Sequence, residues 1–158
     1  MPKKFVAMPT TFSSQGDDEF PALHTTPQYY QPENVLEVEV RNPRTHGTSR
    51  SMYTDYEIAV HSNLPLFKRE SVVLRRFSDF VAFRELLERE LPHVFLASLP
   101  PKVFRNRFSD EVISERTAKL GQFIQQVSSH PLVQTGAAKL LTSFIQDDHW
   151  DAEAWFCE

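Results

Sequence analysis

The fold is decided around Arg75-Arg76-Phe77-Ser78-Asp79-Phe80, where the sequence changes from a strand pattern to a helix pattern. The Val-Val-Leu run at residues 72–74 is typical of a strand. Apolar residues after the stretch recur at helical spacing through residue 91. Ser78 is the predicted N-cap of this helix, and Asp79 in its first turn would complement the helix dipole. Two arginines and an aromatic ring at such a junction predict an anion-binding site.

Three strand patterns surround or precede this junction. Residues 36–41 alternate apolar and charged side chains, and Asn42-Pro43 is expected to end this first strand. Residues 53–60 and 71–77 predict the second and third strands, with polar connections between them. Consecutive strands with short connections favour an antiparallel meander.

Three helices are predicted after the strands: residues 79–91, a helix from residue 109, and residues 137–146. Ser109 is the predicted cap of the second helix, and His130-Pro131 is expected to end it. Residues 1–32 contain scattered prolines and no periodicity, so they are predicted to form a disordered arm. Its aromatic residues either reflect chance or mark a segment that orders against a protein partner. Residues 148–158 form an acidic tail that contains two tryptophans.

Length and composition indicate one domain with flexible ends. The chain has 158 residues and a formal net charge of −4, which argues against a general nucleic-acid binder. Residues 102–108 nevertheless contain three basic residues and no acid, which indicates a local anionic target. Cys157 is the only cysteine, so a cytosolic or cytosol-facing protein is expected. No apolar run approaches the ~20 residues that a membrane span needs.

The sequence contains no catalytic or metal-binding pattern. Its six histidines lack metal-ligand spacing, and no Gly-rich phosphate loop is present. No serine or cysteine nucleophile has a recognisable base. We therefore expect no enzyme activity, no cofactor and no bound metal.

Arg116 is the residue that the helix pattern does not explain. At about 100° per residue it falls between Ile113 and Leu120, inside the apolar stripe of the second helix. An unpaired buried guanidinium costs several kcal/mol, so Arg116 reaches solvent, pairs with a core carboxylate or binds an anion. Arg76 and Lys102 also lack an obvious acidic partner. Three cations on three separate elements favour one shared anion.

Several motifs occur together in one order: Glu33-Asn34-Val35-Leu36-Glu37-Val38-Glu39-Val40, Tyr53-Thr54-Asp55-Tyr56-Glu57-Ile58, Asn63-Leu64-Pro65, Arg75-Arg76-Phe77-Ser78-Asp79-Phe80, Leu99-Pro100-Pro101-Lys102 and His130-Pro131-Leu132. As a set they resemble the phox-homology (PX) domain, in particular the sorting nexin-3 type, which is little more than this domain. The resemblance covers residues 33–147. It implies an α+β fold, a three-stranded antiparallel sheet packed against a helical subdomain. The implied ligand is phosphatidylinositol 3-phosphate in endosomal membranes.

The resemblance also assigns roles to four residues. Arg76 would grip the 3-phosphate, and Phe77 would form the floor under the inositol ring. Lys102 would contact the 1-phosphate, and Arg116 would hydrogen-bond the 4- and 5-hydroxyls. Two positions depart from the family pattern. Phe77 replaces the usual tyrosine and keeps the stacking face, while Ala97 replaces a proline and leaves the segment before Lys102 less rigid.

The segment after Lys102 is a candidate for membrane contact through Phe104, Arg105 and Arg107. Each basic residue at an anionic surface adds about 1 kcal/mol, and a phenyl ring buried among acyl chains adds about 1.5–3 kcal/mol. A core contact is the alternative for Phe104. Ser78 lies next to the predicted site, so its phosphorylation would add negative charge there and release the protein from a membrane.

The resemblance implies a peripheral membrane adaptor. Such a protein would work with retromer coat subunits to retrieve membrane-protein cargo from early or prevacuolar endosomes toward the Golgi, exchanging with the cytoplasm. The arm before residue 33 is where a coat contact is expected. The alternative is a protein-interaction module that presents the proline segment, residues 99–102, to an aromatic groove and binds no lipid.

Overall fold

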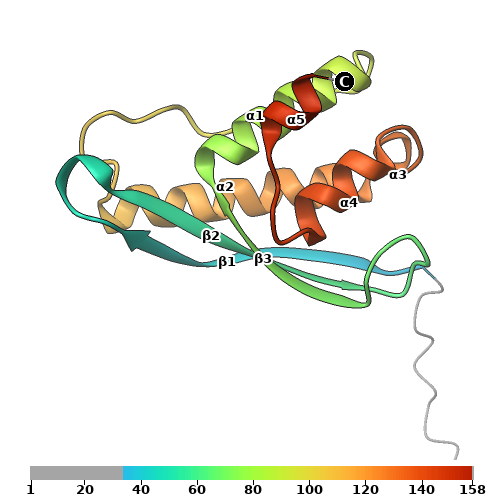
Figure 1. Ribbon diagram of the computed structural model, residues 1–158, viewed down its shortest axis with the longest axis horizontal. Coiled ribbons are helices and arrows are strands. Elements are labelled where there is room, and N and C mark those ends of the chain that lie inside the picture. The colour runs from blue at the N-terminus through green and yellow to red at the C-terminus, as the bar shows by residue number, and fades with distance from the viewer. Residues whose placement is uncertain (1–33, 158) are drawn as a thin grey trace, which may run out of the picture. The chain divides into compact units, whose positions relative to one another are not determined.

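The computed structural model describes residues 34–157, which lie in one compact unit. Their fold is α+β, as predicted, with helices packed on one face of a three-stranded antiparallel sheet (Figure 1). Strands β1 (Leu36–His46), β2 (Tyr53–Ser62) and β3 (Glu70–Arg76) lie in the order β1-β2-β3. Each strand is antiparallel to the next one along the chain, which confirms the predicted meander.

The first strand is longer than predicted. Asn42-Pro43 does not end it: β1 continues to His46, with a register shift between Arg41 and Arg44. Asn42 has a φ of 47°, in the left-handed region that asparagine tolerates better than most residues. This irregularity accommodates a proline, which has no N–H to donate to a ladder, and pairing with β2 then resumes.

Three of the helices correspond to the predicted ones: α1 (Phe77–Glu90), α2 (Asp110–Ser129) and α4 (Ala138–Gln146). A further helix, α3 (Pro131–Gly136), is not predicted by the sequence pattern. His130 ends α2 as expected, but its Nδ1 also accepts a hydrogen bond from Leu132 N at 3.2 Å and so caps α3. Two shorter pieces complete the described elements, the 3-10 turn η1 (Ser49–Ser51) and α5 (Ala152–Phe156).

The two predicted helix caps have different outcomes. Ser109 Oγ accepts a hydrogen bond of 3.4 Å from a backbone N–H in the first turn of α2, which confirms this cap. The prediction for Ser78 is wrong, because α1 begins at Phe77, two residues before the predicted start, and Ser78 lies inside its first turn. The carboxylate of Asp79 satisfies the helix start instead: its Oδ2 accepts a hydrogen bond from Arg76 N at 2.7 Å. Burial raises the pKa of Asp79, and this hydrogen bond opposes the rise.

An aromatic cluster joins the helices above the sheet. The rings of Phe83 and Phe144 stack with their centroids 4.0 Å apart. Trp150 meets Phe144 edge-on at 5.0 Å, so the C-terminal segment contributes to this packing. Arg89 Nη2 donates a hydrogen bond of 2.8 Å to the carbonyl of Trp155, which helps to hold α5 against α1.

Candidate functional site

A pocket of about 380 Å³ lies where β3 passes into α1, and we call it the junction pocket. Its walls come from the start of β2, the β3–α1 junction, residues 102–108 and α2. All four residues that the sequence analysis assigns to a lipid headgroup line this pocket: Arg76, Phe77, Lys102 and Arg116. The fold therefore brings together an aromatic ring and three cations that lie far apart in the sequence.

Arg76 is the last residue of β3, and its side chain is half exposed, at 51%. Its guanidinium lies over the ring of Tyr53, 3.6 Å from the centroid. The expectation that no acid is reserved for Arg76 is wrong, since Asp55 faces it across the β2–β3 pair. The Nε–Oδ1 distance of 3.5 Å is longer than a well-formed hydrogen bond. Arg76 is thus held by a ring and a loose ion pair.

Arg116 projects from α2 toward the same pocket, with its guanidinium 4.3 Å from the ring centroid of Phe77. Within residues 34–157 its Nε is buried without a hydrogen-bond partner. No carboxylate in that range forms an ion pair with it, so the alternative of a core carboxylate is wrong. Arg116 covers part of the Phe77 ring, and a ligand above Phe77 would share that surface with it.

Two tyrosines of the pocket were not predicted from the sequence, although strand alternation contains the signal for one of them. Tyr53 lies two residues before Asp55 and so belongs to the same face of β2 as the partner of Arg76. Tyr56 is fully buried, and its hydroxyl has no hydrogen-bond partner among the described residues. Burial raises the pKa of Tyr56, and the positive charge of Arg116 opposes that rise. The Tyr56 hydroxyl and the Nε of Arg116 are thus both buried without a well-formed hydrogen bond, although the two side chains interact electrostatically.

The segment after Lys102 presents its side chains to solvent. Lys102 and Arg105 are exposed, and Arg107 is exposed with its guanidinium 4.7 Å from the ring centroid of Phe108. Phe104 has 88% of its surface exposed, so the alternative of a core contact is wrong. Phe104 and Arg107 line the junction pocket, whereas Arg105 does not.

Ser78 also lines the junction pocket and is exposed in the first turn of α1. A charge added to its hydroxyl would face the pocket wall that Arg76 and Phe77 form. Since Ser78 does not cap α1, its replacement leaves the capping hydrogen bond of Asp79 in place. The residue can therefore be changed without removing the helix start.

Comparison with known proteins identifies the class of this fold and pocket. The profile of the PX domain matches residues 67–148. The crystal structure of a designed CISK-PX domain superposes with a TM-score of 0.59 at 29% identity, over 70% of this chain and 98% of that one. The mouse SNX19 PX domain with bound sulphate ion has a TM-score of 0.50 at 18% identity, over 71% and 97% of the two chains. That second likeness supports the fold alone.

The sequence is also similar to proteins named Sorting nexin-3. The protein from Aspergillus oryzae is 59% identical over 128 residues, which are 80% of this chain and 89% of that protein. The one from Yarrowia lipolytica is 59% identical over 80% of this chain and 84% of that protein. The one from Candida glabrata is 47% identical over 87% and 93%. The chain belongs to the PX-domain family and, within it, to the sorting nexin-3 proteins.

Family membership supports a role as a sorting-nexin adaptor, and PX domains in general bind phosphoinositide membranes. The matches indicate no enzyme family. None of the helices in residues 34–157 is long and apolar enough to cross a bilayer.

Proposed function

We propose that this protein is a peripheral membrane adaptor that binds phosphatidylinositol 3-phosphate. In this proposal it works with retromer coat subunits to retrieve membrane-protein cargo from early or prevacuolar endosomes toward the Golgi. The family supports the adaptor role, and the junction pocket supports the choice of lipid. The observation that carries the proposal is that Arg76, Phe77, Lys102 and Arg116 line one pocket.

Each of these residues has a role that suits its place. Arg76, steadied by Tyr53, offers a planar donor fork to the 3-phosphate. Lys102, which lines the same pocket, offers a point charge to the 1-phosphate. Arg116 offers a buried Nε that no residue of the described chain satisfies, and the ring hydroxyls would accept from it. The remaining surface of Phe77 provides the floor.

The exposed segment after Lys102 supplies affinity that does not depend on the headgroup. Phe104 is close to fully exposed and is flanked in the sequence by basic residues. Burial of its ring among acyl chains would contribute about 1.5–3 kcal/mol. Arg105 and Arg107 would add about 1 kcal/mol each at an anionic surface. The headgroup then selects the membrane, and this segment prolongs residence on it.

Liposome co-sedimentation tests the lipid. The full chain is mixed with vesicles of neutral lipid that carry phosphatidylinositol 3-phosphate, another monophosphorylated phosphoinositide or phosphatidylserine. We expect clearly stronger binding to the first vesicles than to the others, and the loss of this preference in Arg76→Ala. Lys139→Ala is the matched control, because it removes an exposed positive charge from α4, outside the junction pocket. If Arg76→Ala and the control Lys139→Ala both bind these vesicles as strongly as the wild type, the headgroup site is contradicted.

Ser78 is proposed as a regulatory position for this site. Ser78→Glu places a negative charge in the lining of the pocket, and Ser78→Gln is its neutral counterpart of similar size. We expect Ser78→Glu to weaken liposome binding through repulsion of the 3-phosphate, while Ser78→Gln binds like the wild type. Equal affinity of the two variants would remove the regulatory role.

The coat contact is proposed for residues 1–32, which lie outside the described residues. The proposed organisation is this arm, the PX domain at residues 33–147 and the segment 148–158. A chain that begins at residue 33 should still bind liposomes but lose binding to purified retromer subunits. Retention of full retromer binding by that truncated chain would place the contact elsewhere.

A further inference from the structure

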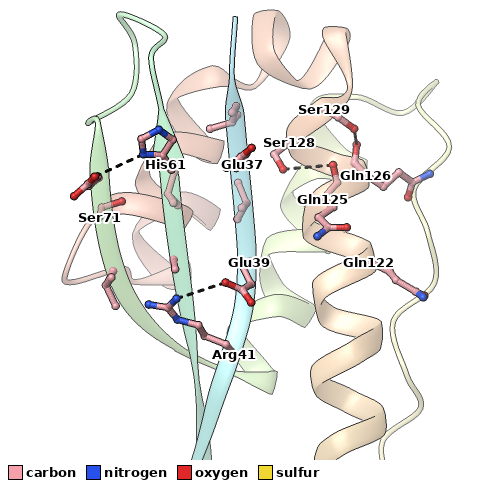
Figure 2. A pocket seen from close by; sticks show the side chains of 16 residues that line it. Glu37, Glu39, Arg41, His61, Ser71, Gln122, Gln125, Gln126, Ser128 and Ser129 are labelled. Atoms are coloured by element: carbon pink, nitrogen blue, oxygen red, sulfur yellow. Dashed lines mark hydrogen bonds and ion pairs between the residues drawn. The ribbon is translucent and has the colours of Figure 1, made fainter. Parts of the chain in front are cut away.

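A second cavity, of about 960 Å³, lies along β1 and is lined by residues of all three strands and of α2 (Figure 2). We call it the edge groove. It shares no lining residue with the junction pocket, so a molecule in one leaves the residues of the other uncovered. Neither the headgroup roles nor the membrane segment uses any of its residues.

One wall of the edge groove is an unpaired strand edge. Among the described strands β1 pairs only with β2, so its other edge has no strand partner. Residues 36–41 pair in regular register with residues 57–62, and the irregularity begins only after Arg41. Every second residue of such an edge points its backbone N–H and C=O away from the sheet. The groove therefore contains a regularly paired run of strand whose outer edge has no strand partner among the described residues.

The facing wall is a polar flank of α2. Gln122, Gln125 and Ser129 are exposed along it, and Figure 2 shows Gln125 on the side of the helix nearer β1. No hydrogen bond within the described residues uses the side-chain amide of Gln125. Gln126 is different, because its Oε1 accepts from Ala97 N at 2.8 Å. The flank offers amide donors and acceptors suited to an extended backbone beside β1.

The charge of the groove is acidic. Glu37, Glu39 and Glu70 line it, against one arginine, Arg41. Arg41 is already engaged, with Nε 2.7 Å from Glu57 Oε1 and Nη1 3.5 Å from Glu39 Oε2. Glu37 has no ion pair or hydrogen bond within the described part of the chain. An occupant with positive charge at alternate positions would complement this face.

We propose that the edge groove binds an extended, basic segment of a partner protein, which adds to the sheet as a strand beside β1. Side chains directly opposite in an antiparallel pair lie about 4.5–5.5 Å apart, so Lys or Arg at alternate positions faces Glu37 and Glu39. Charges on an edge strand also deter unwanted pairing. Here the charges that line β1 are mainly of one sign, and the same groove contains the polar flank of α2, so this combination selects one kind of strand. The proposal goes beyond lipid binding.

The test uses the full chain without lipid and a capped synthetic peptide of sequence Thr-Lys-Thr-Lys-Val-Lys-Thr. Fluorescence anisotropy measures binding, and NMR amide shifts locate it. We expect shift changes confined to residues 36–41 and 122–129. Glu37→Lys should weaken binding about three- to tenfold, because attraction becomes repulsion. Glu85→Lys is the matched control, since Glu85 is exposed on α1 and outside the groove, and it should change binding less than about twofold.

Two altered peptides separate strand addition from simple charge attraction. A peptide with glutamate in place of lysine should not bind, and one with N-methyl groups on alternate amides should bind far more weakly. Thermal melting of Glu37→Lys confirms that the variant is folded. The proposal is overturned by shift changes outside the groove, by equal effects of Glu37→Lys and Glu85→Lys, by N-methylated peptides that bind undiminished, or by no binding of the lysine peptide.

Discussion

Arg75 and Arg76 are neighbours in β3, yet they lie in opposite environments. Strand alternation sends one side chain into the core and the other to the outer face. Arg75 is 3% exposed and donates hydrogen bonds to the carbonyls of Phe144 at 2.9 Å and Ser143 at 3.3 Å. It also donates to the carbonyl oxygens of Leu74 and Asp147. Arg76 is half exposed and has a ring and one loose ion pair.

The difference shows how to separate a structural cation from a binding cation. Arg75 satisfies carbonyls at the C-terminal end of α4, where a positive charge also complements the helix dipole. Burial lowers the pKa of Arg75, and nearby carboxylates, Asp79 first among them, oppose this. Arg76 and Arg116 keep donors that the protein does not fully use. The first arginine stabilises the fold, and the other two are available to a ligand.

Replacing Arg75 is the strongest test of this comparison. Arg75→Met keeps an apolar stem but leaves the carbonyls at the end of α4 unsatisfied, so we expect a loss of about 3–5 kcal/mol in the free energy of unfolding. Urea denaturation measures the loss. Arg76→Met is the matched control and should cost no more than about 1 kcal/mol, because its ion pair is exposed. Similar losses for both variants would show that the two arginines do not differ in role.

Replacing the guanidinium of Arg76 by a different positive charge is expected to have the next largest effect. Arg76→Lys keeps the charge but loses the planar donor fork and its stacking on Tyr53. If one charge-assisted hydrogen bond to the lipid phosphate is lost, affinity for liposomes with phosphatidylinositol 3-phosphate falls about tenfold. The unfolding free energy should stay within about 0.5 kcal/mol. Unchanged liposome affinity would mean that a point charge suffices and that the ring beneath Arg76 has no part in binding.

The sequence was sufficient for the parts of this fold that depend on local patterns. Alternation predicted the three strands, helical spacing predicted three helices, and Ser109 was recognised as a cap. Local patterns failed where a small competing interaction decided the outcome. The carboxylate of Asp79 reached back to the helix start and displaced Ser78 from the cap position, and a bulge let β1 continue past Asn42-Pro43.

The pocket shows a second limit of the sequence. Arg116 was recognisable because its charge interrupts an apolar stripe, and the structure places it beside Phe77. The pairing of Arg76 with Asp55 depends on the register between β2 and β3, which the strand patterns alone did not specify. The role of Tyr53 follows from the same register. Arg116 could be identified because it breaks the helix pattern, whereas Asp55 and Tyr53 fit the strand pattern and therefore gave no sign of a role in the pocket.

Arg116 extends the comparison to a partly buried arginine whose guanidinium lies over the ring of Phe77 and whose Nε has no hydrogen-bond partner among the described residues. Arg116→Met removes an unsatisfied buried donor, so the free energy of unfolding should be unchanged or rise by up to about 1 kcal/mol. Liposome affinity should fall about five- to tenfold, from the lost hydrogen bonds to ring hydroxyls. Urea denaturation and co-sedimentation of the same preparation measure both. A variant that loses stability as Arg75→Met does would make Arg116 a structural residue.

Tyr56→Phe is expected to have the smallest effect on the free energy of unfolding, and the direction in which that effect changes with pH can be worked out. Its hydroxyl is buried without a partner, so Tyr56→Phe should raise the free energy of unfolding by up to about 1 kcal/mol at neutral pH. Above pH 10.0, the ordinary value, the unfolded state loses the phenolic proton before the folded state does, because burial raises the pKa of Tyr56. Wild-type stability therefore falls as pH rises through this window, and that contribution is absent from Tyr56→Phe.

Urea denaturation of both proteins at neutral and alkaline pH measures this difference. The gap in unfolding free energy between Tyr56→Phe and the wild type should widen as the pH increases, since other titrating groups affect both proteins alike. Tyr53→Phe is the control, because that variant keeps the ring beneath Arg76 and removes the hydroxyl of a residue that is only partly buried. A constant gap for Tyr56→Phe would mean that the buried hydroxyl is satisfied in solution. Arg116, which already interacts with this hydroxyl and opposes the rise in the pKa of Tyr56, would then be its partner, and the two groups would act as one pair.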